Sequence, residues 1–154
     1  GIAKADKKAD REAKEGFIGS YIHHNGKIAV LVEVNCETDF VAREEGFQEL
    51  ARNVAMHIAM AAPSYTRTED VPESAVEEER TALLRQAKEE GKPDEVAAKI
   101  VEGRLKKWFS EIVLLEQPYV KDDKRTVDEL VKEATATLGE NIQIGRFARI
   151  AIGD

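Results

Sequence analysis

The residues best suited to binding a partner lie where an expected strand meets an expected helix, at Thr38-Asp39-Phe40-Val41. Junctions of this kind are usually polar, whereas Phe40 places a large apolar ring where the backbone leaves the sheet. In one interpretation, Thr38 or Asp39 is the N-cap of the next helix and Phe40 contacts the preceding hairpin from the first turn. In the other, the ring inserts into another molecule. The residue types alone favour capping.

The three histidines are the usual candidates for metal or acid–base chemistry. His23 and His24 are neighbours on an expected strand and should point to opposite sides of it, which is poor geometry for holding one ion. His57 lies near the apolar stripe of an expected helix. A hydrogen-bonded packing histidine is the favoured interpretation there, and an interaction role is the alternative. The histidines therefore predict no metal site.

Other reactive patterns are weak. No glycine-rich loop has the context of a phosphate site, and no serine has a His and a carboxylate in a nucleophile pattern. Cys36 is expected to be a buried, inert thiol. The glutamates at 77–79 and 89–90 have the spacing of a solvated helix face, and the aromatics in residues 106–109 fit a core stripe better than a base-stacking patch. We expect no enzyme and no cofactor.

The composition excludes several classes of protein. The 154 residues fit a domain with one main core. The net charge of -7 opposes direct binding to nucleic acid, and no apolar run approaches the roughly 20 residues that cross a bilayer. A single cysteine excludes an intrachain disulfide and favours a reducing compartment. Residues 1–15 are charged, rich in alanine and without an apolar stripe, which predicts a charged helical linker before a core domain at 16–154.

Two alternating segments flank Asn25-Gly26, a dipeptide typical of a type I′ hairpin turn. Pairing outward from this turn gives the partners Ile28 with His23, Val30 with Tyr21, Val32 with Gly19 and Val34 with Phe17. This apolar face should meet the helices. The opposite face carries Ile18, Ile22 and Leu31, and a face of this mixed kind often meets another subunit.

Three helical patterns follow the hairpin. An apolar stripe predicts one long amphipathic helix over residues 40–62. A second helix should begin at Pro72 and end before Gly91. A third should run from Asp94 until Gln117-Pro118, with its apolar positions, Trp108 and Phe109 among them, in the core.

The last part of the chain predicts one more helix and one more strand. Thr126 and Glu129 have the capping-box spacing, and Gly139 should end the helix that they begin. Residues 142–152 alternate as a strand. The fold class should therefore be α+β, a small three-stranded antiparallel sheet, made of the N-terminal hairpin plus the C-terminal strand, covered by helices.

Residues 33–43 closely resemble the signature of the elongation factor Ts family, the guanine-nucleotide exchange factors for elongation factor Tu in translation. Further matching segments are 56–59, 103–107, 115–120 and 139–142, so the resemblance spans nearly the whole chain. It implies a chain that binds elongation factor Tu·GDP and promotes GDP release, allowing GTP to bind, without covalent catalysis. It also implies a cytoplasmic location, with an organellar matrix or stroma as the alternative.

The resemblance also implies roles for particular residues. By motif match, Thr38, Asp39, Phe40 and Val41 would displace magnesium from the G domain of elongation factor Tu, with Phe40 as a wedge between helices of that partner. His57 would be a further partner contact.

The resemblance also bears on assembly. Short family members with one core subdomain work as homodimers, and the sheet face with Ile18, Ile22 and Leu31 fits such a dimer. Family members usually begin with a small helical domain, and residues 1–15 resemble only the connector after it. We therefore expect weaker partner binding than that of an intact family member.

Two other classes of function stay open. One is a dimerisation module that kept the fold and lost exchange activity, which would not need Phe40. The other is a small enzyme that uses His57 with a helix carboxylate, which would need a pocket with convergent polar groups.

Overall fold

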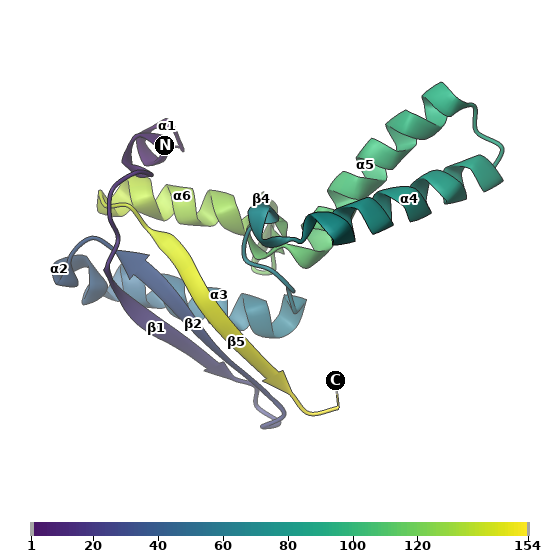
Figure 1. The fold of residues 1–154 in the computed structure, drawn as a ribbon. Coiled ribbons are helices and arrows are strands. Elements are labelled where there is room, and N and C mark those ends of the chain that lie inside the picture. Colours follow the sequence, from purple (N-terminus) through teal and green to yellow (C-terminus); the bar gives the residue numbers. More distant parts are fainter. Residues whose placement is uncertain (1, 154) are drawn as a thin grey trace. The chain divides into compact units, whose positions relative to one another are not determined.

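The computed structural model describes residues 2–153, which fold into two compact units. The sheet unit consists of the chain up to Ala62 together with the chain from Pro118 onward, and the helical unit is Pro63–Gln117. The sheet unit thus joins segments from both ends of the sequence, as the purple and yellow strands of Figure 1 show.

Three antiparallel strands form the sheet, in the order β1 (Glu15–Ile22), β2 (Ile28–Cys36) and β5 (Gln143–Ala151) (Figure 1). The register of β1 on β2 is the predicted one, with the partners Tyr21–Val30, Gly19–Val32 and Phe17–Val34. Helices pack against this sheet. The predicted α+β fold, a hairpin plus a C-terminal strand covered by helices, is therefore confirmed.

The predicted type I′ turn is wrong, although the register around it is right. The His23 amide donates to the Ile28 carbonyl at 2.8 Å, so four residues rather than two form the loop. Gly26 has a positive φ of 72°, whereas Asn25 does not. The Asn25 side chain accepts from the Lys27 amide at 3.0 Å, which is the local bond of an Asx turn.

One face of the sheet forms the core, as the alternation predicts. Val30, Val32 and Val34 are buried, and α3 (Glu45–Ala61) packs against β1 and β2. The helix comes so close to β1 that a Cβ on Gly19 would lie 2.3 Å from the Ala51 carbonyl oxygen. A larger residue at this position would push the helix off the strand.

The expectation of one helix over residues 40–62 is wrong. The segment forms a short helix, α2 (Asp39–Ala42), and then α3, with Glu44 in an extended conformation between them. In a continuous helix, Ala42 would lie roughly 140° around the axis from Phe47, because each residue turns about 100°. Both side chains are buried. The break lets the short helix and the long one each turn an apolar side to the core.

The helix α6 (Val127–Leu138) begins and ends as predicted. Thr126 Oγ1 accepts from the Glu129 amide at 3.1 Å, and Glu129 Oε1 accepts from the Thr126 amide at 3.1 Å. Gly139 closes the helix with a φ of 80°. The sequence pattern did not reveal the short hairpin of β3 (Pro118–Tyr119) and β4 (Asp122–Thr126) just before this helix.

Within residues 1–15, the chain forms α1 (Ile2–Lys8), which packs against α6. Ala5 is buried there, and Lys132 Nζ lies 3.4 Å from Asp6 Oδ1. The division into a linker at 1–15 and a core domain at 16–154 stays a prediction.

The helical unit is a pair of helices with short 3-10 turns. It contains η1 (Thr68–Asp70), α4 (Glu73–Glu89), α5 (Asp94–Ile112) and η2 (Leu114–Glu116). The two long helices were predicted, but α5 ends earlier than expected and Trp108 and Phe109 are half-buried rather than core residues. No described helix has both the length and the apolar character that a membrane span needs.

Candidate partner-binding site

The motif of residues 38–41 lies between the end of β2 and the first residues of α2 (Asp39–Ala42). Thr38 is the N-cap of α2, in an extended conformation, and its Oγ1 accepts from the Val41 amide at 3.4 Å. The capping interpretation is thus confirmed for Thr38, although the helix that it caps is the four-residue α2 and not the long helix.

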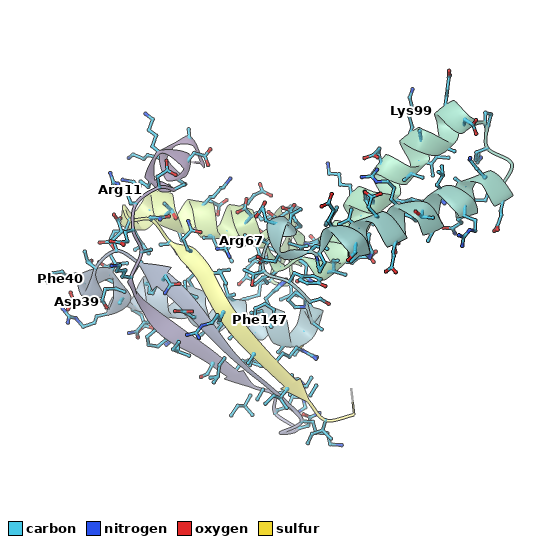
Figure 2. The ribbon with its side chains drawn as sticks, in the orientation of Figure 1. Arg11, Asp39, Phe40, Arg67, Lys99 and Phe147 are labelled. Carbon is cyan, nitrogen blue, oxygen red and sulfur yellow. The ribbon has the colours of Figure 1, made fainter. Side chains whose placement is uncertain are left out.

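Phe40 points away from the protein, so of the two interpretations the one in which its ring contacts the hairpin is wrong. Its side chain is 71% exposed, while Val41 is 6% exposed. Figure 2 shows Asp39 and Phe40 at the outer edge of the ribbon beside α2. Because Val41 and Ala42 turn into the core, their neighbour Phe40 must face outward. Among the Phe, Tyr and Trp side chains of residues 2–153, only that of Phe40 is exposed.

Arg43 holds the two exposed side chains of the turn. Its Nη1 lies 3.0 Å from Asp39 Oδ2, and its Cζ lies 5.4 Å from the centroid of the Phe40 ring. All three groups are solvent-exposed, so the ion pair and the cation–π contact each contribute at most about 1 kcal/mol. These contacts restrict the Phe40 rotamer without covering the ring.

A carboxylate distant in sequence holds the backbone of the turn. Glu140, in the turn between α6 and β5, accepts from the amides of Glu37 and Thr38 through Oε1, each at 3.0 Å. Its Oε2 accepts from the Thr38 hydroxyl at 2.6 Å. In return, Glu37 Oε2 accepts from the Asn141 amide at 2.9 Å. We call these four bonds the Glu37–Glu140 clamp.

The sequence reasoning missed the clamp. Its only signal was that residues 139–142 match the family, and that match assigned no role to Glu140. A spacing rule could not find it, because Thr38 and Glu140 are 102 residues apart.

His57 is fully buried, so the structure does not bring its ring to the surface that exposes Phe40. The Val120 amide donates to His57 Nδ1 at 3.1 Å, and the ring centroid lies 5.9 Å from that of Tyr119. His57 therefore fixes the hairpin of β3 and β4 onto α3. A hydrogen-bonded packing histidine was the favoured interpretation from periodicity, and this geometry agrees with it.

The other histidines differ from the expectation. The rings of His23 and His24 do not point to opposite sides, since their centroids lie 4.2 Å apart. The reason is that His24 belongs to the hairpin loop rather than to a strand. Among the described residues, no group of three or more His, Cys, Asp or Glu side chains could hold a metal ion.

Cys36 lies directly beneath the motif, at the end of β2. Its side chain is fully buried, and its Sγ donates to the Thr38 carbonyl at 3.2 Å. Burial is the main cause that raises the pKa of this thiol to about 11, and the nearby Glu140 raises it further. The buried position expected from the sequence is confirmed.

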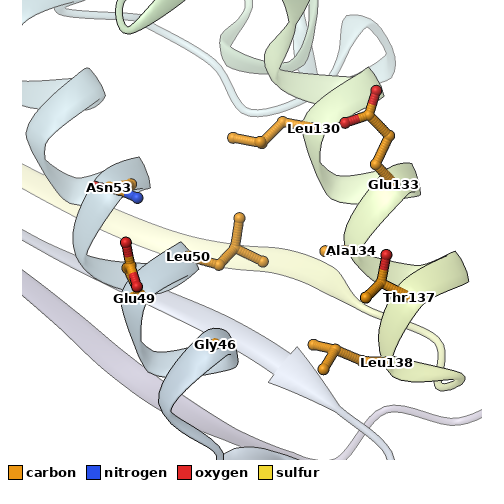
Figure 3. Close-up of a pocket in the computed structure, with 9 residues that line it drawn as sticks. All are labelled: Gly46, Glu49, Leu50, Asn53, Leu130, Glu133, Ala134, Thr137 and Leu138. Carbon is orange, nitrogen blue, oxygen red and sulfur yellow. The ribbon is translucent and has the colours of Figure 1, made fainter.

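A pocket of about 280 Å³ lies between α3 and α6. Figure 3 shows Leu50, Leu130 and Leu138 extending into the space between the two helices. Glu49, Asn53, Glu133 and Thr137 are the polar lining residues, and no His, Cys or Ser is among the lining residues. The pocket can contact an apolar group through its three leucines.

The outer face of the sheet is exposed. Ile18, Ile22 and Leu31 are each more than half exposed. Ile150 of β5, opposite Ala29 of β2, adds another exposed apolar side chain to the same face. The sequence reasoning named the first three and missed Ile150.

Known proteins are similar to this chain along nearly its whole length. The family model described as Elongation factor TS matches residues 4–154. The chain is 55% identical to Elongation factor Ts of Solidesulfovibrio magneticus, over 100% of the chain and 77% of that relative. It is 56% identical to Elongation factor Ts of Nitratidesulfovibrio vulgaris, over 99% of the chain and 76% of the relative. For Elongation factor Ts of Thermosipho melanesiensis, the identity is 51% over 100% of the chain and 79% of the relative. The chain therefore belongs to the elongation factor Ts family of translation elongation factors.

Proposed function

We propose that this chain binds elongation factor Tu·GDP and promotes the release of GDP, so that GTP can bind. The observation that carries this proposal is Phe40, whose ring is 71% exposed on a turn that is capped at Thr38 and anchored by the buried Val41. An exposed aromatic ring on a fixed backbone is well suited to fill a pocket on a partner, because little conformational freedom is lost on binding.

The proposed mechanism is a mechanical one. Phe40 wedges between helices of the G domain of elongation factor Tu and displaces the residues that hold magnesium. The ion is the largest positive charge near the nucleotide phosphates, so its loss weakens GDP binding. Asp39 adds negative charge or a hydrogen bond close to the same site. No covalent step and no cofactor of this chain take part.

The energetics of exchange follow from linkage. If this chain binds the nucleotide-free partner more tightly than the GDP-bound one, GDP must weaken the binding of this chain by the same factor. The proposed site of action is the cytoplasm, where translation elongation takes place.

The test is the release of fluorescent GDP from elongation factor Tu by wild type and by Phe40→Ala. We expect fast release by wild type and at least a roughly thirtyfold loss in Phe40→Ala, since truncation of a hot-spot residue removes about 2 kcal/mol or more. Val96→Ala, which also shortens an exposed apolar side chain but in the helical unit, is the control and should match wild type. Equal release by wild type and Phe40→Ala would contradict the wedge.

His57 has an indirect role in this proposal. It is buried and holds the Val120 amide, while the Val120 side chain is exposed. We propose that His57 serves partner binding by fixing this hairpin, so that Val120 rather than the imidazole touches elongation factor Tu.

We further propose that two copies of the chain pair through the outer face of the sheet. The exposed side chains of Ile18, Ile22 and Leu31 support this, because a monomer seldom leaves a large contiguous apolar patch in water. Leu31→Arg, in the middle strand, should turn dimers into monomers in light scattering at micromolar concentration. A wild-type chain that is already monomeric there would contradict the dimer.

A further inference from the structure

We propose that Glu140 is a positioning residue for nucleotide exchange: its carboxylate holds the turn of residues 37–41 in the geometry that presents Phe40. This inference rests on the proposed function and deepens it. Glu140 itself contacts neither nucleotide nor magnesium in this scheme. It acts through the backbone of the motif.

The first argument is that Glu140 completes a capping box that the local sequence leaves unfinished. In a capping box, the side chain of the N3 residue accepts from the N-cap amide. The N3 residue of α2 is Val41, which is buried and has no acceptor. Glu140 takes its place by accepting from the Thr38 amide at 3.0 Å.

The second argument concerns the Thr38 hydroxyl. It donates to Glu140 Oε2 at 2.6 Å and accepts from the Val41 amide at 3.4 Å. The carboxylate thus fixes the direction of the hydroxyl so that its lone pairs face the start of α2. Without Glu140, the hydroxyl could rotate and the cap would lose its orientation.

The third argument is that the clamp is reciprocal and rests on the sheet. Glu140 accepts from the Glu37 amide, and Glu37 accepts from the Asn141 amide at 2.9 Å. Residue 143 then pairs with Asn35 at the end of β2. Both sides of the clamp are therefore continuous with paired strands, which gives a wedge a rigid base.

The test compares the release of fluorescent GDP by wild type, Glu140→Ala and Glu140→Gln, at low and at saturating chain concentrations. Glu140→Ala should slow GDP release about tenfold or more, because the substitution leaves three hydrogen-bond donors of the turn without their acceptor. Glu140→Gln should recover most of the rate, since its carbonyl can accept from both amides and its NH₂ can donate to the Thr38 hydroxyl. Glu133→Ala, which removes a carboxylate of α6 that pairs with Arg125 rather than with the turn, is the control and should match wild type.

A second measurement needs no partner. Hydrogen exchange of the Glu37 and Thr38 amides should be faster in Glu140→Ala than in wild type, and near wild type in Glu140→Gln. Release by Glu140→Ala equal to that of Glu133→Ala would overturn the inference. If the wild-type chain did not accelerate GDP release from elongation factor Tu, the proposed function would be wrong. Equal amide protection in wild type and Glu140→Ala would then overturn the clamp independently.

Discussion

Two helices of the sheet unit begin at a threonine N-cap whose amide donates to a glutamate side chain. The two glutamates lie in different parts of the sequence. At α6, Glu129 follows Thr126 by three residues, and the two bonds of the capping box are both 3.1 Å. At α2, the glutamate that accepts from the Thr38 amide is Glu140, 102 residues further along. The hydrogen bonding at the two N-caps is nearly the same. The carboxylate is local in sequence at α6 and distant in sequence at α2.

The difference shows what each helix start is built for. The 12-residue α6 has an apolar face of its own, so its cap only has to define where the helix begins. The four-residue α2 is far too short to be stable alone, because helix nucleation is unfavourable. At α2, the N3 position is occupied by the buried Val41, which anchors the turn. The carboxylate then has to come from another part of the sheet unit, and it ties the turn to that part.

The largest effect on stability should come from giving α2 a local capping box like that of α6. Val41→Glu would give Thr38 a local capping-box partner, but it would also place a carboxylate at a position that is 6% exposed. We expect it to lower the free energy of unfolding by about 3 kcal/mol or more, because a buried charge without a partner is costly. Urea denaturation measures this.

The reverse change, Glu129→Val, provides the matched control. It removes only a helix cap at α6 and should lower the free energy of unfolding by about 1 kcal/mol. Equal losses in the two variants would show that Val41 is not needed as an anchor.

A smaller effect should separate stability from exchange at the two threonines. Thr126→Ala should lower the free energy of unfolding by about 1 kcal/mol, the usual loss for an N-cap, and leave GDP release unchanged. Thr38→Ala should lower the stability by no more than that, yet slow GDP release, because the turn loses its fixed direction. Thermal unfolding and fluorescent GDP release, measured on the same samples, give both quantities. Slower GDP release with Thr126→Ala would contradict the prediction that only the Thr38 cap affects exchange.

The smallest effect at neutral pH concerns Cys36, beneath the turn at α2. Its pKa is raised from 9.0 to about 11 in the folded chain. Between these pH values, the thiol keeps its proton in the folded state and loses it in the unfolded state. Its contribution to stability is complete below about pH 9 and is lost as the pH rises towards 11.

The same thiol reports on the clamp through alkylation at pH 8. The reaction should be slow in wild type, faster in Glu140→Ala, and unchanged in Glu129→Val, whose lost cap lies at the other helix. The rate is measured with iodoacetamide and mass spectrometry. Equal rates in the two variants would mean that Glu140 does not hold the turn over Cys36.

Local patterns in the sequence predicted much of the fold. The capping box at Thr126 and the end of α6 at Gly139 depend on residues a few positions apart, and the structure has both. The β1–β2 register followed from alternation around residues 25–26, even though the loop itself differs. The break between α2 and α3 was not predicted, because the stripe of α3 hides the different phase of residues 41–42.

The candidate site was predicted only in part. The motif identified residues 38–41 and their cap. The residue types left open whether Phe40 contacts the hairpin or faces outward, since exposure depends on which neighbours are drawn into the core. Glu140 could not be found by spacing, because its contact with Thr38 depends on how β5 pairs with β2. The hairpin at 118–126 was missed because β3 has only two residues and the five residues of β4 are all polar, so neither strand shows an apolar alternation.

The separation between Thr38 and Glu140 also sets an order of assembly. A ribosome makes the motif first and its carboxylate partner 102 residues later, and domains fold as they emerge. The turn that presents Phe40 can therefore reach its working geometry only when β5 has been made and has joined β2. A chain made only as far as α6 lacks the clamp, so the contact proposed for elongation factor Tu becomes available only after β5 has been made.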